Sequence, residues 1–539
     1  MTTTPARGLP AAATASAPGP HAPGPSAATA SARGPSASTP LPDRPPVAWV
    51  PVLGVAAALA VVLGLVSSRY GYFGDEYYFL SAGARRAAGY ADQPPMLPLL
   101  AAALQHLAPG NLVVLRLPAT LLTAVGAVVA ALIAAELGGA RRAQVIAAVA
   151  TATSPYLLAT GHLLATSTVD PLCWSVVLLL LVRWLRLEAH PDARGAPTRD
   201  RLLLALGVVV GVALFDKILI PVLLAAVAVG VVVAGPRRLL GRPLLWAGLG
   251  IAALSTAPTL VWQAQHGWPQ LRMGSVVAGE SSLFGNRWEF LPRALYYAGV
   301  LPGAVLVVLG LWALLRTERM RPWRSLGIAT ALVTLVLLAA GGRPYYLSGL
   351  YALVLAAGAV AAGTLARRPW HRWWRWTLRP AAVALGAVLA LLWVLPVGPA
   401  SWRAPTEFET MGQVGWPEFT ESVAQAWRAV PAPQREHTVV VAYSYWYASA
   451  LEHEGPVHGL PTPIYSTHRG FGYFDVPPDS DDALLVGDVK WAPRFCARLV
   501  PLPRSPFSAV APVNSDVPMA LCTPRAPWAQ AWPSLRNLA

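Results

Sequence analysis

Charged residues are scarce in this sequence. They make up 12% of its 539 residues, and 55% are hydrophobic, whereas soluble domains carry about 25% charged residues. Three cysteines are too few to cross-link a chain of this length, which excludes a disulfide-built scaffold. The apolar content also excludes a disordered chain. Because the apolar residues gather in long runs, we expect an all-α polytopic membrane protein.

The basic residues give the chain a net charge of +15, a value that many nucleic-acid-binding proteins share. Here, however, the arginines lie in short clusters between apolar runs, which is how membrane proteins set their orientation. We therefore exclude nucleic acid as a partner and expect the lipid bilayer instead.

Apolar runs divide the chain into three regions. Residues 1–46 contain eleven prolines and no aromatic residue, so we expect a disordered cytoplasmic tail. Residues 47–400 hold eleven runs that are long enough, or nearly so, to span a bilayer. They lie at about 47–66, 113–137, 143–160, 170–187, 202–215, 218–234, 243–262, 294–315, 325–341, 346–365 and 381–399. The shorter run at 94–108 is expected to lie at the membrane interface.

Loop charges predict the orientation of these spans. With a cytoplasmic N-terminus, the inner segments hold 22 Lys and Arg residues and the outer segments hold 8, as the positive-inside rule requires. Two long outer loops then cover residues 68–112 and 263–293. We expect a multi-pass protein of a bacterial plasma membrane, and the odd number of spans places residues 401–539 outside.

The C-terminal region, residues 401–539, has a different composition, in which Pro, Asp and Glu return. The β-type runs His437–Tyr447 and Ala483–Val489 predict a small extracytoplasmic α/β domain. Cys496 and Cys522 both lie in this domain, on the oxidising side of the membrane, so they are candidates for a disulfide. Cys173 lies in a predicted span and is expected to serve packing.

Ionisable residues gather at the predicted outer ends of the spans, where they are costly and therefore suspected of function. Taken singly, each has a plain structural explanation: Asp170 could cap a helix, and Asp216 with Lys217 could form a local ion pair. Together they predict a polar cavity under the two outer loops. The residues concerned are Asp75, Glu76, Asp92, Arg116, Asp170, Asp216, Lys217, His266, Arg287, Arg293 and Arg343.

This combination of acids and cations suits one kind of chemistry. A carboxylate can act as general base towards a hydroxyl group, and cations can stabilise an anionic leaving group such as a lipid phosphate. The sequence has no Walker motif and no zinc-protease motif. Since nucleotides are absent from the outer face, we expect an activated lipid as the donor.

Several segments resemble a known family. Tyr72–Tyr78, Tyr90–Pro95 and Leu115–Pro118 resemble the glycosyltransferase family 39-like enzymes of the GT-C superfamily, which include protein O-mannosyltransferases and lipid A aminoarabinose transferases. Further segments fit the bacterial members, so that the resemblance covers about residues 47–400. They are Thr168–Pro171, Phe215–Lys217, Trp262–Trp268 and Arg343–Leu350. The C-terminal region, from Gly415 to Pro533, looks like the outer domain of actinobacterial-type members.

The resemblance implies a GT-C-like fold and inverting transfer of a mannose- or arabinose-type sugar. The sugar would pass from a polyprenyl-phosphate donor to a hydroxyl group of a glycan, lipid or protein. It identifies Asp75 as the catalytic acidic residue with Glu76 beside it, Asp92 as a second loop carboxylate and Asp170 as a supporting one. Arg116 matches an arginine that approaches the lipid phosphate.

Other site residues are assigned less directly. Lys217, Arg287, Arg293 and Arg343 are candidates for the donor phosphate by charge and by side of the membrane alone. No cofactor is required by the sequence, but metal dependence varies in the superfamily, and Asp92 with His266 could bind a divalent ion. Gln93 stands where the aminoarabinose branch carries a lysine.

A transporter or flippase of lipid-linked sugars is the alternative interpretation. It would place ionisable residues at mid-helix depth, and the predicted spans hold almost none.

Overall fold

The computed structural model describes residues 43–189, 196–280, 285–365, 375–403, 408–479 and 481–538. Most of the predicted N-terminal tail therefore lies outside the described residues. All described residues belong to one compact unit, Leu41–Ala539.

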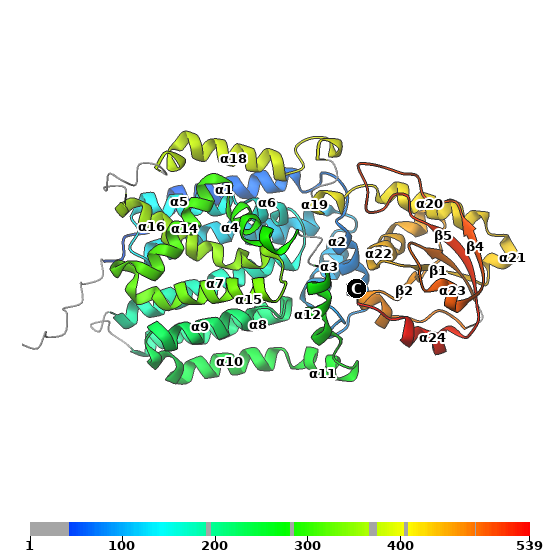
Figure 1. The fold of residues 1–539 in the computed structure, drawn as a ribbon, viewed down its shortest axis with the longest axis horizontal. Coiled ribbons are helices and arrows are strands. Elements are labelled where there is room, and N and C mark those ends of the chain that lie inside the picture. Colours follow the sequence, from blue (N-terminus) through cyan, green and yellow to red (C-terminus); the bar gives the residue numbers. More distant parts are fainter. Residues whose placement is uncertain are drawn as a thin grey trace, which may run out of the picture. The chain divides into compact units, whose positions relative to one another are not determined.

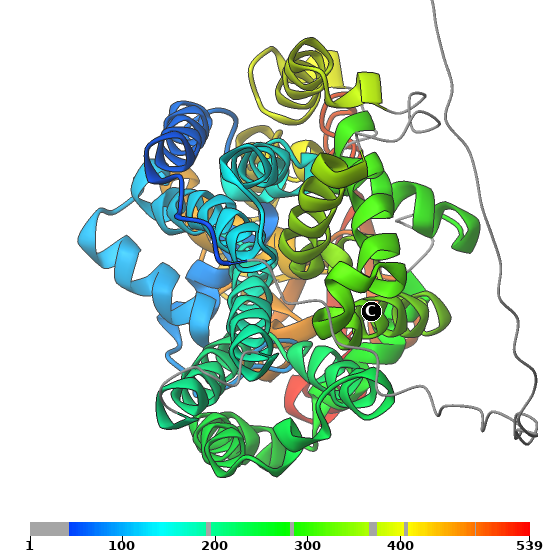
Figure 2. The ribbon, with the colours of Figure 1, turned by 90° about the vertical axis from the view of Figure 1, so that its left-hand side faces the viewer.

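The membrane module is a bundle of apolar helices (Figure 1), and Figure 2 shows many of them end-on. On α1, Val50, Val61 and Leu65 are exposed while Val52 and Leu63 are buried, as expected for a helix that faces lipid on one side. The helices are α1 (Trp49–Val66), α4 (Leu112–Glu136), α5 (Arg141–Ala152), α6 (Pro155–Gly161), α7 (Thr166–Ala189), α8 (Ala196–Asp216), α9 (Ile220–Ala234), α10 (Pro243–Ser255), α11 (Ala257–Gln265), α13 (Phe290–Ala298), α14 (Leu301–Arg316), α15 (Arg324–Ala339), α16 (Tyr351–Leu365) and α18 (Pro380–Val394), with short 3-10 turns η1 (Arg237–Gly241), η4 (Glu318–Trp323) and η7 (Trp376–Leu378).

Three of the predicted spans are bent rather than straight. The runs predicted at 143–160, 243–262 and 294–315 each divide into two helices, with bends of 59°, 45° and 107°. Prolines at the first turn of α6, α11 and α14 lack the N–H group that would continue the preceding helix. Gly299, at φ +159°, separates α13 from α14.

The number of spans remains a prediction. Among the described residues, five helices are long and apolar enough to cross a membrane, or up to eight if each bent pair is one span. α9, α18 and α3 (Met96–Leu107) are shorter apolar helices. The protein is a multi-pass membrane protein, and α3 matches the run that the sequence assigns to the interface.

Short elements follow α1 and lie against the C-terminal domain. α2 (Gly74–Ala84) packs against α3 on one side and against α22 (Tyr445–Glu454) of the C-terminal domain on the other. Its start is fixed by Glu76, whose carboxylate accepts a hydrogen bond from the Phe73 backbone N–H at 2.8 Å. Three further elements are α12 (Pro269–Gly279) and the turns η3 (Arg287–Glu289), next to α13, and η5 (Pro344–Leu350), which packs against α7 and α13.

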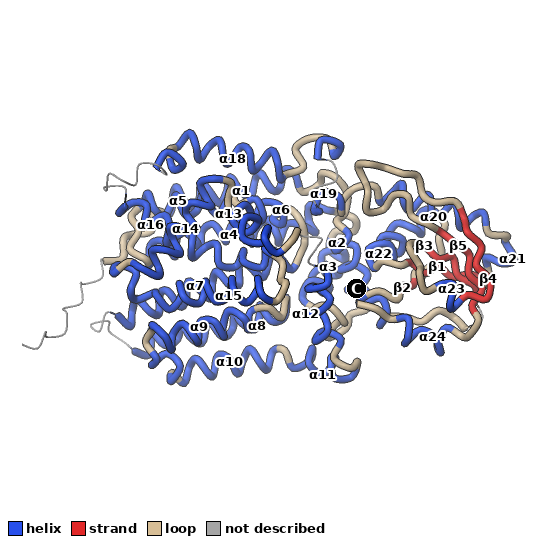
Figure 3. Tube along the Cα trace, in the orientation of Figure 1, coloured by secondary structure: helices blue, strands red, loops and turns tan. Residues whose placement is uncertain are grey.

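The C-terminal domain carries the strands of the described structure (Figure 3). Its sheet has the order β2-β1-β3-β5-β4, parallel between β2, β1 and β3 and antiparallel between β3, β5 and β4. This confirms the predicted small α/β domain. The strands are β1 (Thr438–Ala442), β2 (Tyr465–Ser466), β3 (Asp482–Val486), β4 (Cys496–Leu502) and β5 (Met519–Pro524); the other elements are α19 (Phe408–Met411), α20 (Trp416–Ala429), α21 (Ala432–Arg435), α23 (Ala492–Phe495), α24 (Trp528–Leu535), η8 (Ala400–Arg403), η9 (Gly455–His458) and η10 (Arg469–Tyr473).

Helices cover both faces of this sheet. Alternate residues of β1 point to opposite faces: Val439 and Val441 pack in the cluster with Trp528 of α24, and Val440 packs in the main core. Cys496 and Cys522 form a disulfide between β4 and β5. The β-type run predicted for His437–Tyr447 is too long, because β1 ends at Ala442 and Ser444 caps the start of α22 by accepting from the Trp446 N–H.

Candidate active site

The Asp75 carboxylate lies at the contact between α2 and the C-terminal domain. Its Oδ1 atom accepts two hydrogen bonds from the first turn of α22, from the Tyr445 hydroxyl at 2.8 Å and from the Trp446 indole N–H at 2.7 Å. Asp75 is half-buried. Among the described residues no hydrogen bond reaches its Oδ2 atom, so one oxygen is fixed and the other is open.

Asp92 lies beside this group. The Tyr78 hydroxyl donates to Asp92 Oδ1 at 2.6 Å, and the Tyr78 ring meets the Tyr445 ring edge-on, with centroids 4.9 Å apart. Burial raises the pKa of Asp92, and the charge of Arg469 and the Tyr78 hydrogen bond oppose this rise. Asp75 and Asp92 also interact electrostatically, so the two predicted loop carboxylates share one site.

Arg469 brings a positive charge to the same site from the C-terminal domain. Its guanidinium carbon lies 4.8 Å from the centroid of the Tyr445 ring, and its charge interacts with Asp75 and Asp92. Arg469 has φ +50°, a conformation that costs a non-glycine residue free energy and is found most often at functional sites.

Glu280 bridges two arginines next to this group. Its Oε1 atom accepts from Arg469 at 2.8 Å and its Oε2 atom accepts from Arg343 at 2.6 Å. Arg343 also donates to the Tyr345 hydroxyl at 2.9 Å. Arg343, a predicted phosphate ligand, is thus joined to the site through Glu280.

Lys217 lies on the other side of Tyr345. Its ammonium nitrogen is 4.4 Å from the centroid of the Tyr346 ring and 5.8 Å from that of Tyr345. Asp170 and Asp216 are buried and interact electrostatically with each other and with Lys217. The start of α7 and the end of α8 therefore lie near η5. A line of charged and phenolic groups runs from Lys217 to Arg469.

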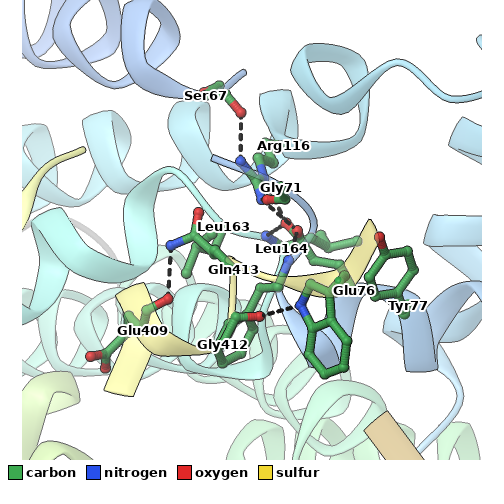
Figure 4. Close-up of polar contacts among 12 residues, drawn as sticks. Ser67, Gly71, Glu76, Tyr77, Arg116, Leu163, Leu164, Glu409, Gly412 and Gln413 are labelled. Carbon is green, nitrogen blue, oxygen red and sulfur yellow. Dashed lines mark hydrogen bonds and ion pairs between the residues drawn. The ribbon is translucent and has the colours of Figure 1, made fainter. Parts of the chain in front are cut away.

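Glu76 and Arg116 form a separate, fully buried ion pair (Figure 4). Arg116 contacts both carboxylate oxygens, through Nε at 2.8 Å and Nη2 at 2.7 Å. It also donates to the backbone carbonyls of Ser67 and Gly71, while Glu76 accepts from the Leu164 N–H. With no exposed surface, the pair holds the loop after α1 onto α4. The catalytic role of Glu76 and the contact of Arg116 with a phosphate stay predictions.

The fold and part of the sequence are similar to known proteins. Residues 92–262 match a family model described as dolichyl-phosphate-mannose-protein mannosyltransferase. No curated protein sequence matches the chain significantly. The structure of ArnT from Cupriavidus metallidurans bound to undecaprenyl phosphate is similar with a TM-score of 0.57 and 16% identity, covering 87% of this chain and 97% of that one. The apo structure of the same protein gives 0.56 and 17%, covering 90% and 99%. The fold is of the GT-C type.

This GT-C-type fold is the one that the sequence resemblance implies, and the described residues place Asp75, Asp92 and Arg343 in one site at the contact between its two modules. Three other candidates have different partners. Arg293 is half-buried, pairs with Glu289 and hydrogen-bonds with the Tyr297 side chain. Arg287 donates to the Ala339 carbonyl at 3.5 Å. His266 is exposed and stacks on Trp262.

Among the described residues, no group of three or more His, Cys, Asp or Glu residues could hold a metal ion. A divalent ion bound by Asp92 and His266 stays a prediction.

The sequence does not predict four residues of this site, which are Glu280, Tyr445, Trp446 and Arg469. The last three belong to the C-terminal domain, which the sequence treats only as a separate domain. One signal is present, because Tyr443, Tyr445, Trp446 and Tyr447 form a dense aromatic run in the C-terminal region.

Proposed function

We propose that this protein transfers a sugar from a polyprenyl-phosphate donor to a hydroxyl group of an acceptor, with Asp75 as general base. The family match and the GT-C-type fold indicate a membrane glycosyltransferase. The neighbouring ArnT structure that holds undecaprenyl phosphate supports the same class of lipid donor. The observation that supports this role for Asp75 is the hydrogen bonding of its carboxylate. Two donors hold Oδ1, and Oδ2 accepts no hydrogen bond from the described residues.

The direction of the proton follows from this arrangement. Tyr445 and Trp446 both donate to Oδ1, so they keep the carboxylate in one orientation and leave Oδ2 for the acceptor hydroxyl. A general base must lie within hydrogen-bond reach of the proton that it removes. Oδ2 meets this requirement for an acceptor that enters beside α2 and α22.

The proposed reaction is a single displacement with inversion. The acceptor O–H proton moves to Asp75, the acceptor oxygen forms a bond to the anomeric carbon, and the bond from that carbon to the phosphate oxygen breaks. Polyprenyl phosphate leaves with the electron pair. The cationic groups that stabilise its developing charge are Lys217 and Arg343, which line one side of the site with Tyr345 and Tyr346.

The sugar and the location of the reaction are part of the same proposal. The resemblance implies a mannose- or arabinose-type sugar, and the loop charges indicate the outer face of a bacterial plasma membrane. Asp92 and Asp170 support the site from its flanks. A glycan, a lipid or a protein could each supply the acceptor hydroxyl.

The test is donor cleavage by the purified, full-length protein. Polyprenyl-phosphate mannose and polyprenyl-phosphate arabinose are each incubated with the protein and a host membrane extract, and free polyprenyl phosphate is followed by mass spectrometry. The proposal expects release with one donor and an acceptor that gains that sugar's mass. Translocation of intact donor in sealed vesicles, with no release, would contradict it and would favour a flippase.

A further inference from the structure

We propose that Arg343 and Arg469, which both contact Glu280, form an anion site, and that the phosphate of the lipid donor displaces Glu280 from it. This inference rests on the proposed function for the identity of its ligand. The site joins the two modules, because Arg343 precedes η5 of the membrane module and Arg469 begins η10 of the C-terminal domain.

Glu280 is placed as a bound phosphate would be. Each of its two oxygens accepts from a different arginine, at 2.6 Å from Arg343 and 2.8 Å from Arg469. The three side chains are only 15%, 16% and 19% exposed for Arg343, Arg469 and Glu280 respectively. Arginine binds carboxylates and phosphates through the same fork of N–H donors, so a phosphate can take both contacts.

Arg469 also retains an unused donor. Its Nε atom is buried, and it has no hydrogen-bond partner within the described ranges. A carboxylate offers two oxygens, whereas the phosphate group of a lipid offers more. A phosphate in this position could therefore satisfy the N–H group that Glu280 leaves without a partner, and an unpaired buried donor is costly.

The segment that carries Glu280 is weakly held by apolar packing. In α12, which ends next to Glu280, Pro269 is the buried residue, and Leu271 is 78% exposed. Apolar burial is the main force that fixes a helix in place. Because α12 has little of it, the contacts of Glu280 with the two arginines are a large part of what fixes this segment, and a competing anion can release it.

The charges favour the exchange as the reaction proceeds. A sugar-phosphate-polyprenol diester carries one negative charge, as Glu280 does. The phosphate monoester that leaves carries about −1.5 to −2. The two arginines therefore bind the departing phosphate more strongly than they bind either Glu280 or the intact donor, which is the differential stabilisation that accelerates a reaction.

The position of the site links it to Asp75. Arg469 stacks on Tyr445, and Tyr445 holds Asp75. A phosphate that replaces Glu280 would contact the same arginine that lies against the residue holding the base. The site thus places the leaving group beside Tyr445, which also holds the base.

The test compares binding of undecaprenyl phosphate to the full-length protein and to Glu280→Gln in nanodiscs. Loss of the competing charge is expected to tighten binding about tenfold, because a carboxylate no longer competes with the phosphate for the two arginines. Arg343→Gln and Arg469→Gln should each weaken binding by a similar factor. Glu280→Asp keeps the charge but shortens the reach, and should bind more tightly than wild type by a smaller factor; it decides the question if Glu280→Gln does not fold.

The matched control is Glu452→Gln. Glu452 also joins the C-terminal domain to the outer loops, through Arg85 at 2.9 and 3.1 Å, with similar exposure. If Glu280 only ties the modules together, both variants should bind the lipid equally or more weakly than wild type, and the proposal is overturned. Glu452→Gln is expected to bind within about twofold of wild type.

Two further measurements, competition by inorganic phosphate and donor cleavage, distinguish the remaining explanations. Inorganic phosphate that competes as strongly as the lipid would show a site for free phosphate and would overturn the lipid assignment. Lipid binding is measured without catalysis. Tighter binding by Glu280→Gln, in a protein that cleaves no donor, would therefore support the anion site and contradict the proposed function. Donor cleavage by a protein whose lipid binding is unchanged in Glu280→Gln would support the proposed function and contradict the anion site.

Discussion

Tyr445 donates a hydrogen bond to Asp75 across 370 positions of the sequence, with the two oxygen atoms 2.8 Å apart. The donor belongs to the C-terminal domain, and the acceptor belongs to α2, in the segment that follows α1 of the membrane module. Trp446 makes a second bond to the same oxygen at 2.7 Å. The C-terminal domain therefore helps to build the site, and it is more than an appendage that could select acceptors.

Tyr445→Phe is expected to lower kcat about tenfold and to leave the KM for the lipid donor within about twofold. The variant removes one charge-assisted hydrogen bond, worth about 1.5–3 kcal/mol, and it keeps the ring that packs on Tyr78. Steady-state kinetics on both substrates are the measurement. Tyr443→Phe, on the same segment but without a contact to Asp75, is the control. A changed KM with an unchanged kcat would remove Tyr445 from the positioning of the base.

Glu76→Ala is expected to destabilise the protein by about 3–5 kcal/mol, because it leaves the buried Arg116 charge without its partner. The double variant Glu76→Leu with Arg116→Leu should lose less than the single one, since it removes both charges. Thermal unfolding in detergent measures both effects. A Glu76→Ala protein that unfolds like wild type but lacks activity would instead return Glu76 to a catalytic role.

His468 is expected to make stability depend on pH. Burial, followed by the charge of Arg469, lowers the pKa of His468 from 6.5 to about 3, and its Nδ1 atom accepts from the Tyr445 N–H at 3.4 Å. Below pH 6.5 the unfolded chain gains a proton that the folded protein does not accept. Stability should therefore fall as the pH decreases from about 6.5 towards 3.

The measurement for this pH dependence is the melting temperature between pH 7 and 4, given as the difference between wild type and His468→Asn. Other titrating groups contribute equally to both proteins, so the difference isolates His468. Parallel curves would contradict the prediction.

Removing the disulfide, by Cys496→Ala with Cys522→Ala, is expected to cost about 3 kcal/mol, as estimated from the loss of a loop constraint. The two cysteines are 26 residues apart. The melting temperature of the oxidised wild type should fall to that of the double variant when a reductant is added. If the reductant has no effect on wild type, the bond does not stabilise the domain.

The fold class of this protein can be predicted from the sequence, but the residues of its candidate site can be predicted only in part. Long apolar runs predict the helical bundle because a bilayer requires them, and the position of the loop charges predicts which end carries the chemistry. Asp75 and Glu76 show the limit. Successive residues on a helix point about 100° apart, so the two side chains cannot both point into the site. The sequence does not say which of them does. The structure buries Glu76 and presents Asp75.

The missing residues are those that tertiary contacts bring in. Tyr445 and Trp446 lie in a run predicted as a strand, and Tyr445 in fact starts a helix. Arg469 lies in a part of the C-terminal domain for which the sequence predicts no site residue. Glu280 has no local signal, because a single carboxylate at the end of an exposed helix is ordinary until two arginines from distant segments reach it. For Arg116 the resemblance implies a contact with the lipid phosphate, and only the structure shows its fully buried pair with Glu76.

The account depends most directly on Asp75, and Asp75→Asn tests it. The amide oxygen of asparagine can still accept the bonds from Tyr445 and Trp446, so the fold should be kept while the base is lost. Release of polyprenyl phosphate from the active donor is expected to fall about 10²–10⁴-fold, with undecaprenyl phosphate binding within about twofold of wild type, and with Asp488→Asn on the protein surface as the control. Release by Asp75→Asn at the wild-type rate would contradict the account.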